Sequence, residues 1–169
     1  MKWAYSGFIN GALCTALKEP LVGWNDCAAW SEVSNVVVEG EGTIDGSGDA
    51  WIASDLGNTR PYLLDLLYVN GLTVRGLKLR KPGFWTTVPI FCNNVRVEGL
   101  DIYTRGSNTD GVDPDSSWNV YIARNTIDTG DDCIAIKAGR DWSGIMVNIS
   151  TTNVLVEENI FKAGHGVSC

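Results

Sequence analysis

The chain has 169 residues, and its 44% hydrophobic and 20% charged content is typical of a globular domain with its own core. Its net charge of −7 argues against nucleic acid as a partner, because binding a polyanion needs a basic surface. No stretch reaches the roughly 18 consecutive apolar residues that cross a membrane. We therefore expect one domain with neither a nucleic acid nor a membrane as its partner.

The first 34 residues show no repeating pattern. They are apolar and include Trp3, Trp24, Trp30, Cys14 and Cys27. We expect them to form either an irregular cap over the open end of the structure that follows or a poorly ordered segment. The start of the chain lacks the sustained apolar run of a signal peptide.

Five segments further along the chain share one pattern, in which apolar residues alternate with polar ones. This alternation is typical of a β-strand with one buried face. After a short turn, a second apolar position follows four of the segments, at Leu79, Ile102, Ile127 and Phe161. The five segments span residues 35–40, 71–76, 94–99, 119–124 and 153–158.

The last four segments recur at steps of 23, 25 and 34 residues. A repeat of this length with two or three short strands per unit predicts an all-β fold, a parallel β-helix (solenoid) over residues 35–169. A β-sandwich also has strands with alternating polarity, but its sequence does not repeat the same short motifs at a constant spacing. In the solenoid we expect stacked inward rows that contain Val95, Val97, Val120, Ile122, Val154 and Val156.

Two details of the repeat carry their own expectations. Asn125 and Asn159 occupy the same place in successive units, which predicts a ladder of hydrogen-bonded asparagines. The longest step contains an insertion near residues 137–152, with two glycines and a serine. We expect this insertion to be a loop over a groove.

Three short motifs fall at similar places in successive units. Asp110 precedes Asp131 by 21 residues, nearly one coil, and Asp131 and His165 each lie 12 residues into their units. We therefore expect the three carboxylates and the only histidine to gather in one groove. The motifs are Asn108-Thr109-Asp110, Gly130-Asp131-Asp132 and Gly164-His165-Gly166.

Crowded carboxylates favour the hydrolysis of a glycosidic bond. Like charges at short range keep one carboxyl group protonated while its neighbours remain bases. The protonated group donates to the leaving oxygen, and one or two carboxylates accept a proton from water. Each motif alone is an ordinary turn sequence, but three on successive coils are harder to attribute to turns. We expect the motif glycines, Gly130, Gly164 and Gly166, to let a bulky sugar approach the backbone.

A zinc site is not expected from this sequence. The five cysteines form no Cys-x-x-Cys pair, and the chain has a single histidine. We interpret Cys133, which stands between an aspartate and an isoleucine, as a small buried residue.

The motifs resemble those of the polygalacturonase family of glycoside hydrolases. The resemblance covers about residue 35 to the end of the chain, and it is supported by residues 42–48, 85–87 and 133–137. It implies a right-handed parallel β-helix that cleaves α-1,4-linked galacturonate in pectin, with inversion and without a metal or other cofactor. It also implies a secreted or cell-wall location, and the insertion is similar to that of the exo-acting branch.

The family pattern implies a role for each motif residue. Asp131 would be the general acid, while Asp110 and Asp132 would activate the water. His165 would tune the protonation of the acid or help to hold the substrate. Asn108 would brace the site and bind the substrate.

The sequence departs from the family pattern after the histidine. The family has an Arg-Ile-Lys motif that binds the substrate carboxylate, and no Arg-x-Lys tripeptide follows His165 here. Lys137, Arg140 and Arg105 remain as candidate cations, and we expect Lys137 to bind the substrate. We also expect the chain to be the central piece of a longer enzyme, with a β-helix that is incomplete at its C-terminus.

Two alternatives stay open. A β-helix similar to a pectate lyase would use the acidic residues to hold calcium and a basic side chain to abstract a proton. A truncated, non-catalytic solenoid would bind pectin without cleaving it. The histidine motif and its glycines favour hydrolysis over the lyase, and the missing cationic motif favours the non-catalytic protein.

Overall fold

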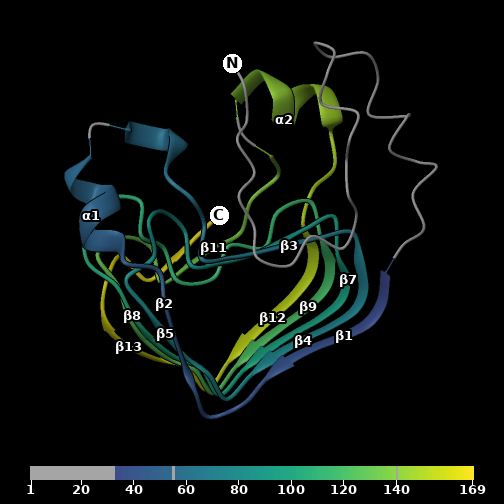
Figure 1. Cartoon of the computed structure of the whole chain (residues 1–169). Coiled ribbons are helices and arrows are strands. Elements are labelled where there is room, and N and C mark those ends of the chain that lie inside the picture. Colours follow the sequence, from purple (N-terminus) through teal and green to yellow (C-terminus); the bar gives the residue numbers. More distant parts are fainter. Residues whose placement is uncertain (1–32, 55, 140) are drawn as a thin grey trace.

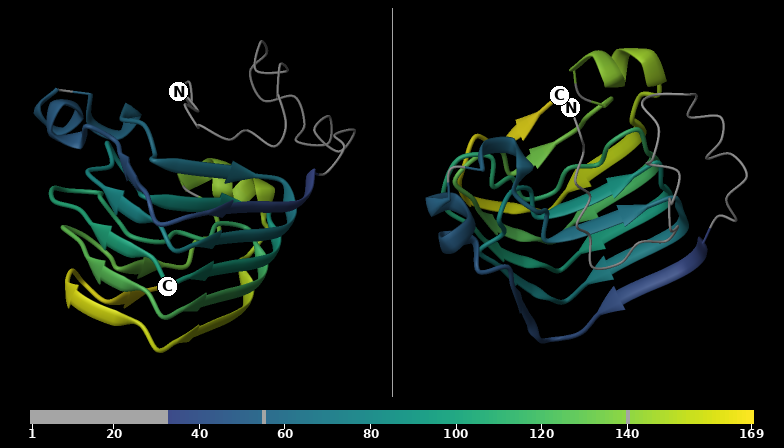
Figure 2. Two further views of the ribbon diagram at one scale, coloured as in Figure 1. Left: turned by 60° about the horizontal axis from the view of Figure 1, so that its bottom comes forward. Right: turned by 45° about the horizontal axis from the view of Figure 1, so that its top comes forward.

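The chain folds as a right-handed parallel β-helix, which confirms the predicted fold class. We describe it from a computed structural model, which places residues 33–54, 56–139 and 141–169. Figure 1 shows two large sheets that converge at the bottom of the view and short helices at the top. Figure 2 shows the coils stacked in sequence order.

Two five-stranded parallel sheets form two sides of each coil, and they contain all the segments that the repeat predicts. The first sheet has the order β1-β4-β7-β9-β12, and the second has the order β13-β10-β8-β5-β2. The strands of the first sheet are β1 (Val33–Glu39), β4 (Val69–Arg75), β7 (Asn93–Glu98), β9 (Trp118–Ala123) and β12 (Thr152–Glu157). Those of the second are β2 (Thr43–Asp45), β5 (Lys78–Arg80), β8 (Asp101–Tyr103), β10 (Thr126–Asp128) and β13 (Ile160–Ala163).

A third side of each coil is built from shorter strands. The strands β3 (Leu64–Leu67) and β6 (Thr87–Ile90) form one parallel pair, and β11 (Ile134–Ala135) and β14 (Val167–Ser168) form another. Single bridges through Val112 and Asp115 join the two pairs across the coil between them. The third side is therefore continuous in register although its strands are short.

Within the described residues, three short helical elements interrupt the coils: α1 (Gly48–Ala53), the 3-10 helix η2 (Gly57–Thr59) and α2 (Asp141–Val147). The prediction of a loop over residues 137–152 was wrong in this respect, because α2 occupies its middle. A Cβ at Gly144 would lie 2.7 Å from the carbonyl carbon of Gly139. The two glycines that suggested a loop instead allow the helix to pack closely on the chain that precedes it.

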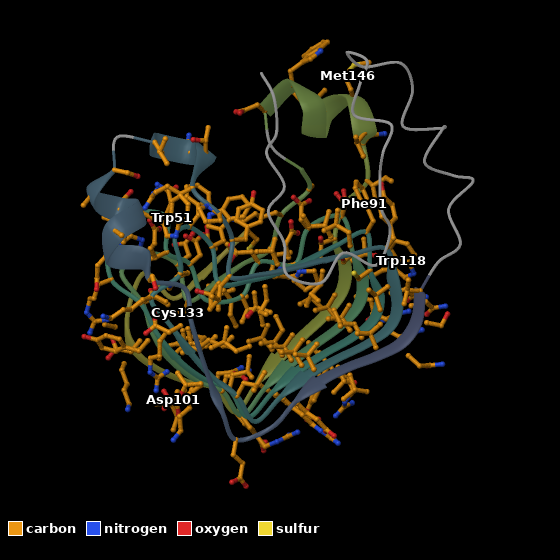
Figure 3. All side chains as sticks on the ribbon, in the orientation of Figure 1. Trp51, Phe91, Asp101, Trp118, Cys133 and Met146 are labelled. Carbon is orange, nitrogen blue, oxygen red and sulfur yellow. The ribbon has the colours of Figure 1, made fainter. Side chains whose placement is uncertain are left out.

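The core is a set of apolar rows that run along the stack. Val95 pairs with Val120, and Val97 pairs with Ile122, and all four are at most 2% exposed. Val154 and Val156 continue these rows on the last coil and are partly buried against the core. The predicted inward rows are confirmed. Figure 3 shows side chains filling the space that the sheets enclose.

Asparagines stack in two ladders along the coils. The predicted ladder is present, since Asn125 Nδ2 donates to Asn159 Oδ1 at 2.9 Å. Asn125 Oδ1 also accepts a hydrogen bond from the Leu100 backbone N–H at 2.9 Å, so this buried side chain ties neighbouring coils together. A second ladder includes Asn119 and Asn153, which have positive φ values of 56° and 53°. Asparagine tolerates this left-handed conformation better than most residues do.

The predicted N-terminal segment of residues 1–34 lies outside the described residues except for 33 and 34. Those two residues already belong to β1. The division of the chain at residue 35 otherwise stays a prediction. No helix in the described part of the chain is long and apolar enough to cross a membrane.

We predict that Ile122→Ala lowers the free energy of unfolding by about 2–5 kcal/mol, because it leaves a cavity in the core row. Leu155→Ala is the matched control, since Leu155 is 53% exposed on the neighbouring strand β12. We expect it to cost less than about 1 kcal/mol. Urea unfolding followed by circular dichroism measures both, and equal losses would contradict the proposed packing.

Candidate active site

The three motifs lie on three consecutive coils, at the point where each coil enters the third side. The bridges Val112↔Ile134 and Ile134↔Val167 set a common register along this side. Asp110, Asp132 and His165 each stand two residues before one of these bridged positions, so they form one column along the stack. The Gly111 N–H donates to the Asp132 carbonyl oxygen at 3.0 Å, and the His165 N–H donates to the Asp131 carbonyl oxygen at 3.0 Å.

Backbone amides hold the Asp131 carboxylate in place. Its Oδ2 accepts a hydrogen bond from the Asn108 N–H at 2.8 Å, and its Oδ1 accepts one from the Asp132 N–H at 3.0 Å. The Asp131 side chain is 26% exposed, so it is partly open to solvent. The carboxylate is therefore fixed by the main chain and still accessible.

The His165 imidazole lies against both carboxylates of the acidic pair. Its Nδ1 is 3.4 Å from Asp131 Oδ1 and 3.3 Å from Asp132 Oδ1. The histidine side chain is 68% exposed, whereas the two carboxylates are 26% and 22% exposed. The arrangement therefore brings one imidazole nitrogen to both carboxylates while most of the ring stays in solvent.

Asn108 contacts the acidic pair through its backbone. Its N–H reaches Asp131, while its side-chain Nδ2 donates to Ser107 Oγ at 2.8 Å. Asn108 has a φ of 56°, a left-handed conformation that directs the N–H at the carboxylate. The structure thus supplies a local reason for asparagine at this position. A contact between its side chain and a substrate stays a prediction.

Asp110 lies deeper than the acidic pair and beside a second acid, Asp113. The Lys137 Nζ atom is 3.4 Å from Asp110 Oδ2 and 3.0 Å from Asp113 Oδ1, and it lies 4.1 Å from the centre of the Trp85 ring. Burial raises the pKa of Asp110, and the charge of Asp131 raises it further, while Asp113 and Lys137 oppose the shift. Burial also raises the pKa of Asp113 well above its usual range.

The other predicted cations are placed differently. Arg105 is half-exposed and pairs with Asp128 at 2.7 Å, and its guanidinium lies over the Tyr103 ring. Arg140 lies outside the described residues. Among the described residues, Lys137 is the predicted cation that lies beside Asp110. Its ammonium is already paired there with the carboxyl groups of Asp110 and Asp113.

Sequence reasoning missed two residues that support the Asn108 loop. The buried Arg60 guanidinium donates from Nη2 to the Ser107 carbonyl oxygen at 2.8 Å. The buried Thr104 hydroxyl donates to the Thr109 carbonyl oxygen at 2.6 Å, and it accepts a hydrogen bond from the Gly130 N–H at 3.2 Å. Neither residue lies in a motif, so no sequence pattern pointed to them.

Two of the motif glycines are needed for the packing of coils. A Cβ at Gly130 would lie 2.6 Å from the Gly106 nitrogen, and one at Gly164 would lie 2.3 Å from Thr129 Oγ1. Gly166 has open space around it but a φ of 81°. Gly130 and Gly164 therefore have a packing role, and the approach of a sugar to them stays a prediction.

Asp131, Asp132 and His165 could together hold a cation, because each offers a ligand atom within 4.8 Å of the others. Calcium prefers six to eight oxygen ligands, and this group offers two carboxylates and an imidazole nitrogen. The donor set is therefore a poor match for calcium, although the calcium alternative is left to experiment. The absence of a metal from the reaction stays a prediction.

Asp65 is a further buried acid on the third side, and its Oδ1 has no hydrogen-bond partner. Burial raises the pKa of Asp65 to about 7. In the unfolded chain an aspartate ionises near pH 4. The folded state therefore loses stability relative to the unfolded state as the pH rises from about 4 to about 7.

We predict that Asp65→Asn is more stable than the natural sequence at pH 8, by a few kcal/mol at most, because it removes the cost of a buried charge. At pH 4 the two proteins should be nearly equal, since the natural carboxyl group is then protonated when folded. Thermal unfolding at both pH values measures the difference. The gain in stability of Asp65→Asn over the natural sequence should be larger at pH 8 than at pH 4. An equal gain at the two pH values would contradict this account.

Comparison with known proteins agrees with the fold and with the family resemblance. The model of the glycosyl hydrolases family 28 matches residues 14–169, and the chain belongs to that family. A probable polygalacturonase of Vitis vinifera is 35% identical over 133 residues, which is 75% of this chain and 27% of that protein. An exopolygalacturonase of Cochliobolus carbonum is 31% identical over 79% of this chain and 30% of its own length.

Two solved structures share the fold. A hyperthermoactive exopolygalacturonase from Thermotoga maritima has a TM-score of 0.61 at 32% identity, over 64% of this chain and 25% of that chain. A polygalacturonase from Erwinia carotovora has a TM-score of 0.67 at 25% identity, over 80% of this chain and 41% of that chain. The chain thus spans less than a third of the length of the two curated relatives.

Proposed function

We propose that the chain acts as a polygalacturonase, or as the catalytic part of one, and hydrolyses α-1,4-galacturonosyl linkages in pectin with inversion. The observation that carries the proposal is the set of Asp110, Asp131, Asp132 and His165 on consecutive coils in a member of family 28. The names of the relatives support polygalacturonate as the substrate, and we extend that substrate to this chain.

The reaction divides the carboxyl groups into an acid and bases. Asp131 is the general acid and gives its proton to the leaving glycosidic oxygen as the bond to the anomeric carbon breaks. Asp110 and Asp132 accept a proton from water, whose oxygen attacks the anomeric carbon from the opposite face. His165 lies against the acid and adjusts its protonation.

The substrate implies a location and a mode of binding. Pectin is a cell-wall polymer, so we propose that the protein acts outside the cell or in the wall. Asn108 braces Asp131 and lines the substrate path. Two relatives are named exopolygalacturonases, which favours removal of residues from the end of the substrate chain, and the insertion that contains α2 is consistent with that mode.

We predict that Asp131→Asn lowers turnover on polygalacturonate by about 10²–10⁴-fold, because an amide keeps the shape but cannot supply the acid proton. Asp132→Asn and Asp110→Asn should also be severe, since each weakens the activation of water. A reducing-end assay on the purified chain measures the rates, and circular dichroism checks the fold.

The matched control for these variants is Asp101→Asn. Asp101 is a half-exposed aspartate on β8 that pairs with Arg80, and Figure 3 shows it on the outer surface. It should keep the parental rate. An Asp131→Asn variant within a few-fold of the parent would show that the acid lies elsewhere.

A second prediction separates hydrolysis from the two alternatives. Hydrolysis should continue in EDTA and give a product with no absorbance from an unsaturated sugar. A lyase that uses calcium would lose activity in EDTA and produce an unsaturated, ultraviolet-absorbing end. Binding of polygalacturonate without new reducing ends, measured by calorimetry beside the assay, would favour the non-catalytic solenoid.

A further inference from the structure

A buried cluster of two acids and one lysine lies beside the acidic pair. It consists of Asp110, Asp113 and Lys137, with the Trp85 ring beneath the lysine. Asp113 belongs to none of the three motifs, and its side chain is fully buried. The Lys137 side chain is only 18% exposed, so its ammonium is held inside the cluster.

The charges of the cluster have to be balanced inside the protein. Two ionised carboxylates and one ammonium would leave a net negative charge in a buried site, which is costly. The Lys137 ammonium lies 3.0 Å from Asp113 Oδ1, but neither oxygen of Asp113 makes a hydrogen bond of good geometry. A proton on Asp113 removes both difficulties, because the cluster becomes neutral and the Asp113 hydroxyl can donate to Asp110.

The titration behaviour of the groups agrees with this assignment. Burial raises the pKa of Asp113 well above its usual range, whereas the pKa of Asp110 is raised less, so Asp113 is the acid that keeps its proton to higher pH. A hydrogen bond from Asp113 and the charge of Lys137 both oppose the effect of burial on the pKa of Asp110. Burial alone would lower the pKa of Lys137, but the two acids raise it, so the lysine stays charged.

The same geometry limits what Lys137 can bind. The ammonium has a carboxyl oxygen of Asp113 at 3.0 Å, a carboxylate oxygen of Asp110 at 3.4 Å and an aromatic face at 4.1 Å. A substrate carboxylate would have to displace at least one of these contacts and would leave a buried acid without its counter-charge. The lysine is therefore better placed to act on Asp110 than on a substrate.

We propose that Lys137 and Asp113 are positioning residues that hold the Asp110 side chain in place and in its ionised form. This inference rests on the proposed function, in which Asp110 must be ionised to accept a proton from water. It replaces the expected role of Lys137 as the anchor of a substrate carboxylate.

The first test needs no turnover. The chain is labelled with aspartate enriched in ¹³C, and the carboxyl signal of Asp110 is identified by its loss in Asp110→Asn. We expect Lys137→Met to raise the titration midpoint of Asp110 by about one pH unit or more, because a neighbouring positive charge is removed. Lys137→Arg keeps the charge and should leave the midpoint closer to that of the parent.

Asp113 is tested in the same titration. Asp113→Asn retains a hydrogen-bond donor and should change the midpoint of Asp110 little, whereas Asp113→Val removes the donor and should raise it. A lower midpoint in Asp113→Val would show that Asp113 is ionised in the native protein and would overturn its assigned role. Circular dichroism confirms that each variant is folded before it is titrated.

Activity provides the second readout. Lys137→Met should move the acidic limb of the pH profile of kcat/KM to higher pH, and Lys137→Arg should restore it. A raised KM with an unmoved limb, or an unmoved Asp110 titration, would overturn the inference and favour direct binding of substrate. A titration that shifts as expected in a chain that does not hydrolyse polygalacturonate would instead count against the proposed function.

Discussion

Parallel pairing of successive coils in a constant register is the constraint on which the other features depend. Each backbone N–H of a coil needs an acceptor on the next, and this need aligns equivalent positions at a spacing of about 4.8 Å. The same alignment produces the buried valine and isoleucine rows, the asparagine ladders and the column of Asp110, Asp132 and His165. A slip of one residue in any coil would therefore disturb the core and the site together.

The third side of the coil contains buried acids, whereas the ion pairs of the other two sides lie at partly or fully exposed positions. Its strands are short and partly replaced by single bridges, so loops enter and leave it at every coil. The loops bring a backbone N–H group to Asp131. Neighbouring coils of this side bring Asp113 and Lys137 together. Regular strands supply rigidity, and the irregular connections between them supply the polar groups.

The acids of this side fall into two environments. Asp131 and Asp132 are partly exposed and lie against an exposed imidazole, so protons can reach them from solvent. Asp110 and Asp113 are buried around one ammonium, where burial and charge decide which of them keeps a proton. Such a difference in environment is the physical means by which one cluster can hold both an acid and a base.

The sequence by itself determined the repeat, the inward rows and the coil on which each motif lies, because the period of a solenoid converts spacing directly into position. It did not reveal that Lys137 is paired with two acids, that Asp65 is buried, or that Arg60 supports the Asn108 loop. It also misread α2 as a loop, because Gly139 and Gly144 suggest flexibility until their close contact is known. These features depend on side chains that meet across coils, and only the tertiary structure decides which partners lie within reach.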